Sequence, residues 1–275
     1  MREWKSKRHI SVSLLVAMLS LMSGCQTVQT TQGGTVGVSR EQSMSLSAQE
    51  VNAAAAKSYS KMLKEAADKK ELNTDAAMTR RVQGIGRKLI AQTKVFRPDA
   101  LSWAWEINVI QTDEVNAFCM AGGKIGVYAG IITRLKMTDA ELAAVMGHEI
   151  SHALREHSRE QLSRQQASQI PGILLTIVTG SSAVGRLGNA VTDVAINLPN
   201  SREAEKEADE MGAELAARAG YDPHAAVTLW EKMNRLNSGR PPEFLSTHPS
   251  PENRIQDLEQ ISRKVAHLYQ PGQGR

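Results

Sequence analysis

Two histidines four residues apart, His148 and His152, restrict the fold of this chain more than any other feature of its sequence. On an α-helix, side chains four residues apart lie on one face with Cβ atoms roughly 5–6 Å apart, so two imidazoles can bind one metal ion. The surrounding segment has a helical pattern, because residues 138–141 (TDAE) form a capping box and apolar residues follow at helical spacing. We therefore predict a helix over about residues 138–158.

Glu149 completes the pattern His-Glu-x-x-His. It is displaced around the helix from the two histidines, so we predict a general base rather than a ligand. Catalytic zinc usually has three protein ligands and one open position. One known arrangement takes its third ligand from a histidine six residues after the second, but Ser158 stands there. His157 lies about 140° around the helix from His152, so we interpret it as a surface histidine and look for the third ligand elsewhere.

A charged segment, residues 201–209 (SREAEKEAD), is the best source of the third ligand. Glu205 and Asp209 share one face of the helix that we predict over about residues 201–219. A charged run of this kind usually means a solvated helix face. Its combination with the His-Glu-x-x-His pattern favours a metal site instead.

The two motifs together resemble the HtpX, BepA and LoiP type of zinc metallopeptidase, which is related to the CAAX prenyl endopeptidases. The resemblance also includes residues 116–118 (NAF), the Gly-Gly-Lys-Ile strand that follows, and residues 248–250 (HPS), so it spans about residues 75–262. It implies one Zn²⁺ per subunit, with His148, His152 and Glu205 as ligands. It also implies Glu149 as catalytic base and Asp209 as the residue that orients a zinc-binding histidine.

The role of His248 stays open at this point. It is a candidate catalytic residue, either as a donor that stabilises the oxyanion or as a gate that closes the fourth zinc position. The alternative is a histidine in a Pro-bounded surface turn (HPSP).

The fold that we predict is α+β and predominantly helical, a zincin-like (gluzincin-type) metalloprotease domain with a small sheet of about three strands. One catalytic domain is expected over residues 46–268, with the motif core at 75–262. The expected strands are Trp103–Ile110, Val115–Cys119 and Lys124–Tyr128, and further helices are expected over about 46–72, 75–93, 223–237 and 251–268. The segment 170–198 is apolar but interrupted by glycines, and it is either buried helix and loop or a membrane-touching or substrate-gating element.

The first 24 residues have the pattern of a signal peptide. A basic start (MREWKSKRH) precedes a mainly apolar run of 13 residues at 10–22, which is too short for a transmembrane helix. Residues 22–25 (MSGC) resemble the lipobox of bacterial lipoproteins, which implies an acylated Cys25. Gln26 stands where an inner-membrane retention signal usually has Asp, so the resemblance implies the periplasmic side of the outer membrane. Residues 25–45 are expected to be a flexible, lipidated tether.

Charge and cysteine content restrict the partners. The formal net charge is +4, and the first 24 residues contribute +3 of it, so the remainder is nearly neutral and gives no reason to expect nucleic-acid binding.

Cys119 has no intrachain partner if Cys25 carries a lipid. A buried thiol is the ordinary interpretation of Cys119, and an intermolecular bridge is the alternative.

The resemblance implies a zinc-dependent endopeptidase that hydrolyses misfolded or envelope proteins, with a membrane contact through its lipid. In this hypothesis a zinc-bound water loses its proton to Glu149, and the strand at 123–128 adds to an extended substrate backbone. Processing of prenylated peptides inside a membrane is not expected, because no apolar run of 18 residues follows the signal. One alternative is a zinc-stabilised chaperone or outer-membrane assembly factor with latent proteolytic activity. Another is a structural lipoprotein without zinc.

Overall fold

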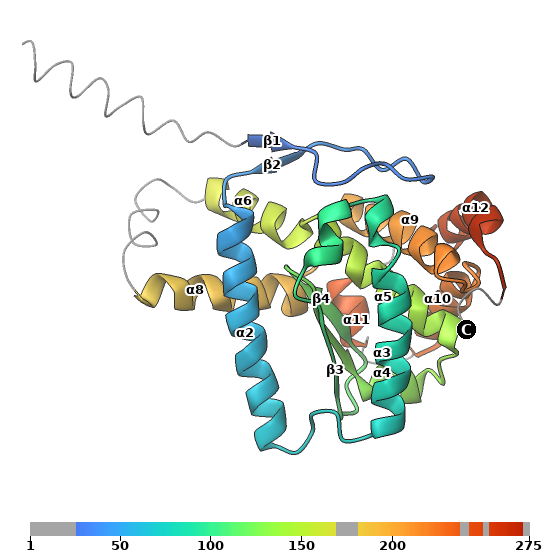
Figure 1. The fold of residues 1–275 in the computed structure, drawn as a ribbon, viewed down its shortest axis with the longest axis horizontal. Coiled ribbons are helices and arrows are strands. Elements are labelled where there is room, and N and C mark those ends of the chain that lie inside the picture. The colour runs from blue at the N-terminus through green and yellow to red at the C-terminus, as the bar shows by residue number, and fades with distance from the viewer. Residues whose placement is uncertain (1–25, 169–180, 237–241, 250–252, 272–275) are drawn as a thin grey trace, which may run out of the picture.

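The computed structural model describes residues 26–168, 181–236, 242–249 and 253–271, and Figure 1 shows their arrangement. Helices dominate and a three-stranded sheet lies among them, which confirms the predicted α+β class. The expected signal peptide, Cys25 and residues 170–180 of the apolar segment lie outside the described residues. In the part of the chain that is described, no helix is long and apolar enough to cross a membrane.

The sheet consists of β3 (Glu106–Ile110), β5 (Lys124–Tyr128) and β4 (Ala117–Met120), in the order β3-β5-β4. β5 runs parallel to β3 and antiparallel to β4. Because β5 lies in the middle, both of its edges are already paired. The expectation that this strand adds to a substrate backbone is therefore wrong.

The outer edge of β3 is also covered. Asn73 donates its backbone N–H to Val109 O at 2.9 Å and accepts from Val109 N at 2.8 Å through its side chain. The Gln83 side chain donates to the carbonyl of Ile107 at 3.2 Å. These contacts satisfy the backbone groups of an edge that would otherwise pair with another chain.

Two long helices form the centre of the domain, α5 (Asp139–Leu154) and α9 (Arg202–Arg218). The capping box at Thr138 and Glu141 begins α5, as the sequence predicts. This helix ends four residues earlier than predicted, because Glu156 adopts a left-handed conformation with φ of 53° and a new helix, α6 (His157–Ser168), follows.

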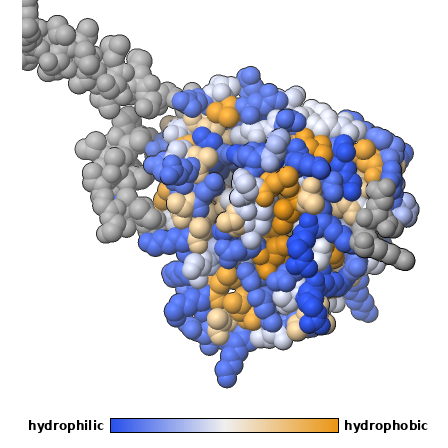
Figure 2. Space-filling view, in the orientation of Figure 1, coloured by the Kyte–Doolittle hydropathy of each residue, from blue (hydrophilic) through white to orange (hydrophobic). Residues whose placement is uncertain are grey.

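The other helices surround this pair and the sheet. Figure 1 shows α2 and α3 on either side of β3 and β4, and Figure 2 shows a band of hydrophobic surface between these two helices. The remaining helical elements are α2 (Ala48–Asp68), α3 (Ala76–Ile90), η1 (Thr93–Val95), η2 (Pro98–Ser102), α4 (Ala129–Arg134), α8 (Ser181–Thr192), η3 (Asp193–Asn197), α10 (Ala225–Leu236), α11 (Glu243–Thr247), α12 (Arg254–Val265) and η4 (Ala266–Leu268).

Residues 26–44, here called the N-terminal strap, pack against the domain. The strap begins with β1 (Gln26–Val28), ends with β2 (Gln42–Met44), which pairs with β1, and lies along the top of Figure 1. Val36 and Val38 are 5% and 4% exposed and belong to the main hydrophobic core. The expected flexible tether is thus wrong for these residues, because alternate valines between glycines give the segment an apolar side that the composition conceals.

Candidate metal centre

Four side chains meet in the interior of the domain: His148, His152, Glu205 and His248. One ligand atom from each lies within 4.8 Å of the others, and all four side chains are buried. His148 Nε2 is 3.0 Å from His152 Nε2, and His152 Nε2 is 3.3 Å from Glu205 Oε1. Ligands about 2.1 Å from a tetrahedral zinc are about 3.4 Å from one another, so the spacing fits this ion.

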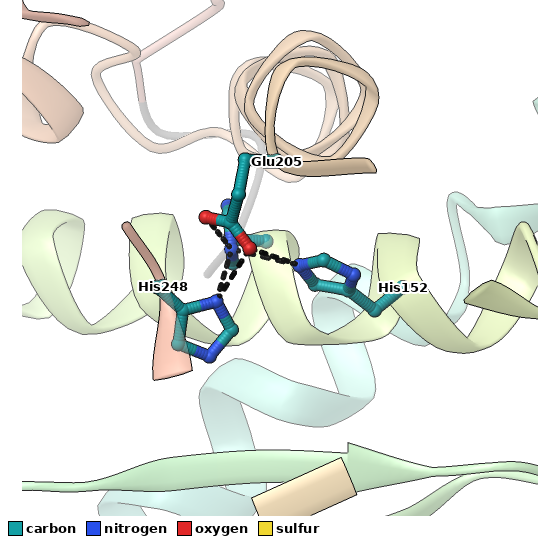
Figure 3. Close-up of side chains that lie close together, drawn as sticks. His152, Glu205 and His248 are labelled. Carbon is teal, nitrogen blue, oxygen red and sulfur yellow. Dashed lines mark hydrogen bonds and ion pairs between the residues drawn. The ribbon is translucent and has the colours of Figure 1, made fainter. Parts of the chain in front are cut away.

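The two central helices position these side chains. His148 and His152 are one turn apart on α5, Glu205 comes from the first turns of α9, and His248 follows α11. In Figure 3 the Glu205 carboxylate points away from α9 toward the rings of His152 and His248. The sequence therefore brings its predicted third ligand to the two histidines.

The hydrogen bonds around the rings leave lone pairs in the centre. His148 Nδ1 is 2.9 Å from Asp209 Oδ1, and His152 Nδ1 is 2.8 Å from His157 Nδ1. With a proton on each Nδ1, the two Nε2 atoms carry lone pairs and face one another. Two lone pairs at this distance repel unless a cation lies between them.

Two carboxylate oxygens also indicate a cation at this position. Glu149 Oε1 and Glu205 Oε2 are buried and lack a hydrogen-bond partner in the described structure. The Arg254 guanidinium forms an ion pair with Glu205 Oε2 at 2.9 Å. Buried carboxylate oxygens nearly always have a partner. The donor set of two imidazoles and the Glu205 carboxylate fits a divalent cation such as Zn²⁺, and Glu149 Oε1 faces the same space.

In the metal-free cluster, His152 is neutral and Glu205 is ionised. Burial lowers the pKa of His152 well below its usual value, so its ring is neutral and can act as a ligand. Burial opposes the charge of Glu205, but His248, His148 and His152 outweigh it and hold the pKa of Glu205 well below its usual value. The carboxylate is therefore available as an anion.

Glu149 lies beside the cluster, and His248 Nε2 is 3.3 Å from its Oε1. Burial raises the pKa of Glu149 to about 8, a shift that His148 opposes and Glu205 reinforces. The backbone of Cys119 on β4 contributes a hydrogen bond that lowers this pKa. Edge strand β4 therefore faces the Glu149 carboxylate.

Asp209 is placed as the sequence predicts. Its carboxylate contacts His148 and accepts two hydrogen bonds of 2.8 Å from Arg254. The Arg254 guanidinium lies 3.6 Å from the ring centre of Trp230. These contacts hold Asp209 against the His148 ring and fix the orientation of that ring.

His248 is 3% exposed, so the alternative of a surface turn is wrong. Its Nδ1 lies 2.9 Å from Glu205 Oε1 and 3.2 Å from His148 Nε2. Its ring stacks on Phe244 with a centroid distance of 4.3 Å. His248 therefore occupies a place next to the predicted ligands, where either a fourth ligand or a donor to substrate would lie.

His157 is not a surface histidine, because it is 3% exposed and contacts His152. The predicted continuous helix would have turned it away, but the left-handed Glu156 between α5 and α6 turns it back. Its Nε2 lies 2.9 Å from Glu207 Oε2. Glu207 was not predicted, because helical spacing places Glu205 and Asp209 on one face of α9 and Glu207 on another.

Two further buried residues lie close to the site, Arg254 and Cys119. Arg254 was missed, and a single arginine in a helix gave no signal of a buried contact. Cys119 is 5% exposed, and burial raises the pKa of its thiol well above the usual value. The ordinary interpretation, a buried thiol, agrees with this position.

Residues 76–262 match the model of Peptidase family M48. The chain belongs to this family. This membership confirms the resemblance to the HtpX, BepA and LoiP type of zinc metallopeptidase, and zinc is the metal of the family.

Curated proteins of two kinds are similar to this chain. Mitochondrial metalloendopeptidase OMA1 of Arabidopsis thaliana is 39% identical over 58% of this chain and 32% of its own length. OMA1 of Schizosaccharomyces pombe is 36% identical over 60% of this chain and 50% of its own length. Beta-barrel assembly-enhancing protease of Escherichia coli is 28% identical over 70% of this chain and 41% of its own length. The chain thus spans between a third and a half of these relatives, whose names support a metalloendopeptidase.

Proposed function

We propose that this chain is a zinc-dependent endopeptidase that hydrolyses misfolded or envelope proteins, with Glu149 as general base. One observation carries the proposal: Glu205 on α9 meets His148 and His152 on α5, and Glu149 lies beside them. The membership in family M48 supports the same activity.

A bound zinc would be held by His148 Nε2, His152 Nε2 and the Glu205 carboxylate, and it would supply a Lewis acid that polarises the scissile carbonyl. Glu149 accepts a proton from the attacking water and passes it to the leaving amine. Its Oε1 has no hydrogen-bond donor and is free to take that proton.

The substrate backbone would lie along β4 rather than along β5. β4 is an edge strand of the sheet, and its Cys119 backbone faces Glu149. A peptide that adds to such an edge is held through its main chain, which gives affinity with little sequence preference. This mode suits a protease for unfolded segments.

We place the protein on the periplasmic side of the outer membrane, held by a lipid on Cys25. The lipobox-like residues 22–25 support this location. The strap, which starts directly afterwards, would keep the domain next to the anchor. The beta-barrel assembly-enhancing protease among the relatives makes outer-membrane assembly machinery a candidate partner.

One observation favours the second candidate, a chaperone or assembly factor with latent proteolytic activity. His248 contacts Glu205 and lies beside Glu149, in the space that a substrate carbonyl would need. A site held in this arrangement binds metal but does not cleave until His248 moves.

Casein degradation tests the proposal. The full chain in detergent should cleave casein, chelation should abolish the cleavage, and added zinc should restore it. Glu149→Gln should bind zinc as the wild type does and lose cleavage, since it keeps the shape of the side chain without the base. Equal cleavage by both proteins would contradict the assigned base, and zinc binding without any cleavage would favour the second candidate.

A further inference from the structure

A second histidine backs the metal-binding His152 on the side away from the cluster. His157 Nδ1 lies 2.8 Å from His152 Nδ1, and His157 Nε2 lies 2.9 Å from Glu207 Oε2. All three side chains are buried. None of these contacts reaches the substrate side, where Glu149 and β4 lie.

The protons in this chain of contacts can be assigned. Glu207 accepts, so His157 carries its proton on Nε2 and has a lone pair on Nδ1. That lone pair accepts from His152 Nδ1–H, which leaves His152 Nε2 without a proton and facing His148 and Glu205. The contacts therefore select the tautomer of His152 that binds a metal.

Two arginines hold Glu207 in place. Arg155 donates to both of its oxygens at 3.0 and 3.1 Å, and Arg40 donates to both at 2.8 and 3.2 Å. Arg155 is fully buried, whereas Arg40 belongs to the N-terminal strap and also pairs with Glu160 at 2.7 Å. A residue outside the part of the chain that matches family M48 thus contacts the support of a metal ligand.

The arrangement parallels the other histidine of the site. His148 contacts Asp209, which Arg254 holds in place. His152 contacts His157, which contacts Glu207, and two arginines hold Glu207 in place. Both carboxylates come from α9. We infer that His157 and Glu207 are positioning residues that hold His152 ready for the metal, and that Arg40 of the strap fixes Glu207 for this task.

This inference rests on the metal site of the proposed function but not on proteolysis, so its test measures metal binding. Zinc affinity of the full chain is measured by competition with a chromophoric chelator, and the ligand geometry by the visible spectrum after Co²⁺ substitution. His157→Phe removes the acceptor and should weaken zinc binding about 10- to 100-fold. His157→Gln keeps an acceptor oxygen and should recover part of the loss. Both variants should change the Co²⁺ spectrum.

The strap supplies a matched pair of variants. Arg40→Met removes a contact to Glu207, whereas Lys264→Met removes a different contact to the strap, from Lys264 Nζ to Val36 O at 2.7 Å. Of this pair, only Arg40→Met should weaken zinc binding. Glu207→Gln should weaken it too, and it replaces His157→Phe as the test if that variant does not fold. Affinities within twofold of the wild type in Arg40→Met and Glu207→Gln, with unchanged Co²⁺ spectra, would overturn the inference. A wild type that binds zinc tightly without cleaving casein would defeat the proposed function alone.

Discussion

Gly147 on α5 and Gly212 on α9 bring the two central helices into backbone contact. A Cβ atom at Gly212 would lie 2.7 Å from the backbone nitrogen of His148, and one at Gly147 would lie 2.8 Å from the carbonyl oxygen of Gly212. Real Cβ atoms do not approach backbone so closely, so any larger residue would push the helices apart. The meeting of Glu205 with the two histidines depends on this contact.

Gly212→Ala should therefore destabilise the protein and weaken its metal site. We expect a loss of about 1–3 kcal/mol in the free energy of unfolding, the usual range for overpacking, and weaker zinc binding. Gly84→Ala on α3 is the control, since its Cβ would meet no atom within 4 Å. That variant should gain about 0.5–1 kcal/mol from helix propensity. Urea unfolding checks both, and an unchanged Gly212→Ala would contradict the packing argument.

Asp209→Asn should weaken zinc binding about 10- to 100-fold, because His148 loses a charged acceptor on Nδ1. It should also destabilise the metal-free protein, since Arg254 keeps a buried charge with one partner fewer. Chelator competition and thermal unfolding measure the two effects. Glu259→Gln, which removes an exposed ion pair with Arg263, should change neither.

Much of the fold follows from local signals in the sequence. The capping box at Thr138 begins α5 as predicted, and a second one at Ser47 begins α2. The glycine pair at 122–123 marks the turn between β4 and β5. The order of the strands in the sheet could not be predicted from such local signals. The pairing that places β5 in the centre is decided by long-range packing, to which a short apolar run gives no clue.

The predicted site residues come together because their spacing on two helices is itself a geometric rule. The residues that surround this site were not predicted, and each has a physical reason. His157 depends on the left-handed conformation of Glu156, and no residue in the segment requires it. Three further residues are charged and would ordinarily be solvated: Arg40, Glu207 and Glu160. Their ion pairs with one another offset the cost of removing these charges from water.

Acid should weaken the attachment of the strap through Glu160. Burial acts to raise the pKa of Glu160, but Arg40 and Gln42 outweigh it and lower the pKa below its usual value of 4.5. The folded state therefore holds the proton less tightly than the unfolded state. The stabilisation is fully present above pH 4.5 and is lost as the pH falls through the lower pKa of the folded state.

Glu160→Gln tests this relation in metal-free protein, where zinc release does not contribute. The variant should unfold at a lower temperature than the wild type at pH 7, and the difference should shrink as the pH is lowered below 4.5. Glu65→Gln, which removes an exposed ion pair with Lys61, should match the wild type throughout. A constant difference at all pH values would show that Glu160 acts through shape rather than charge.

The strap itself should behave as part of the core. Val38 is 4% exposed, and full burial of a valine side chain stabilises by about 1.5–3 kcal/mol. Val38→Ala should therefore cost on the order of 1–2 kcal/mol in the free energy of unfolding. The neighbouring Ser39 is exposed, so Ser39→Ala should stay within about 0.5 kcal/mol of the wild type. If both variants unfold like the wild type, residues 26–44 form the flexible tether that their composition suggests, and Arg40 has no fixed position from which to hold Glu207.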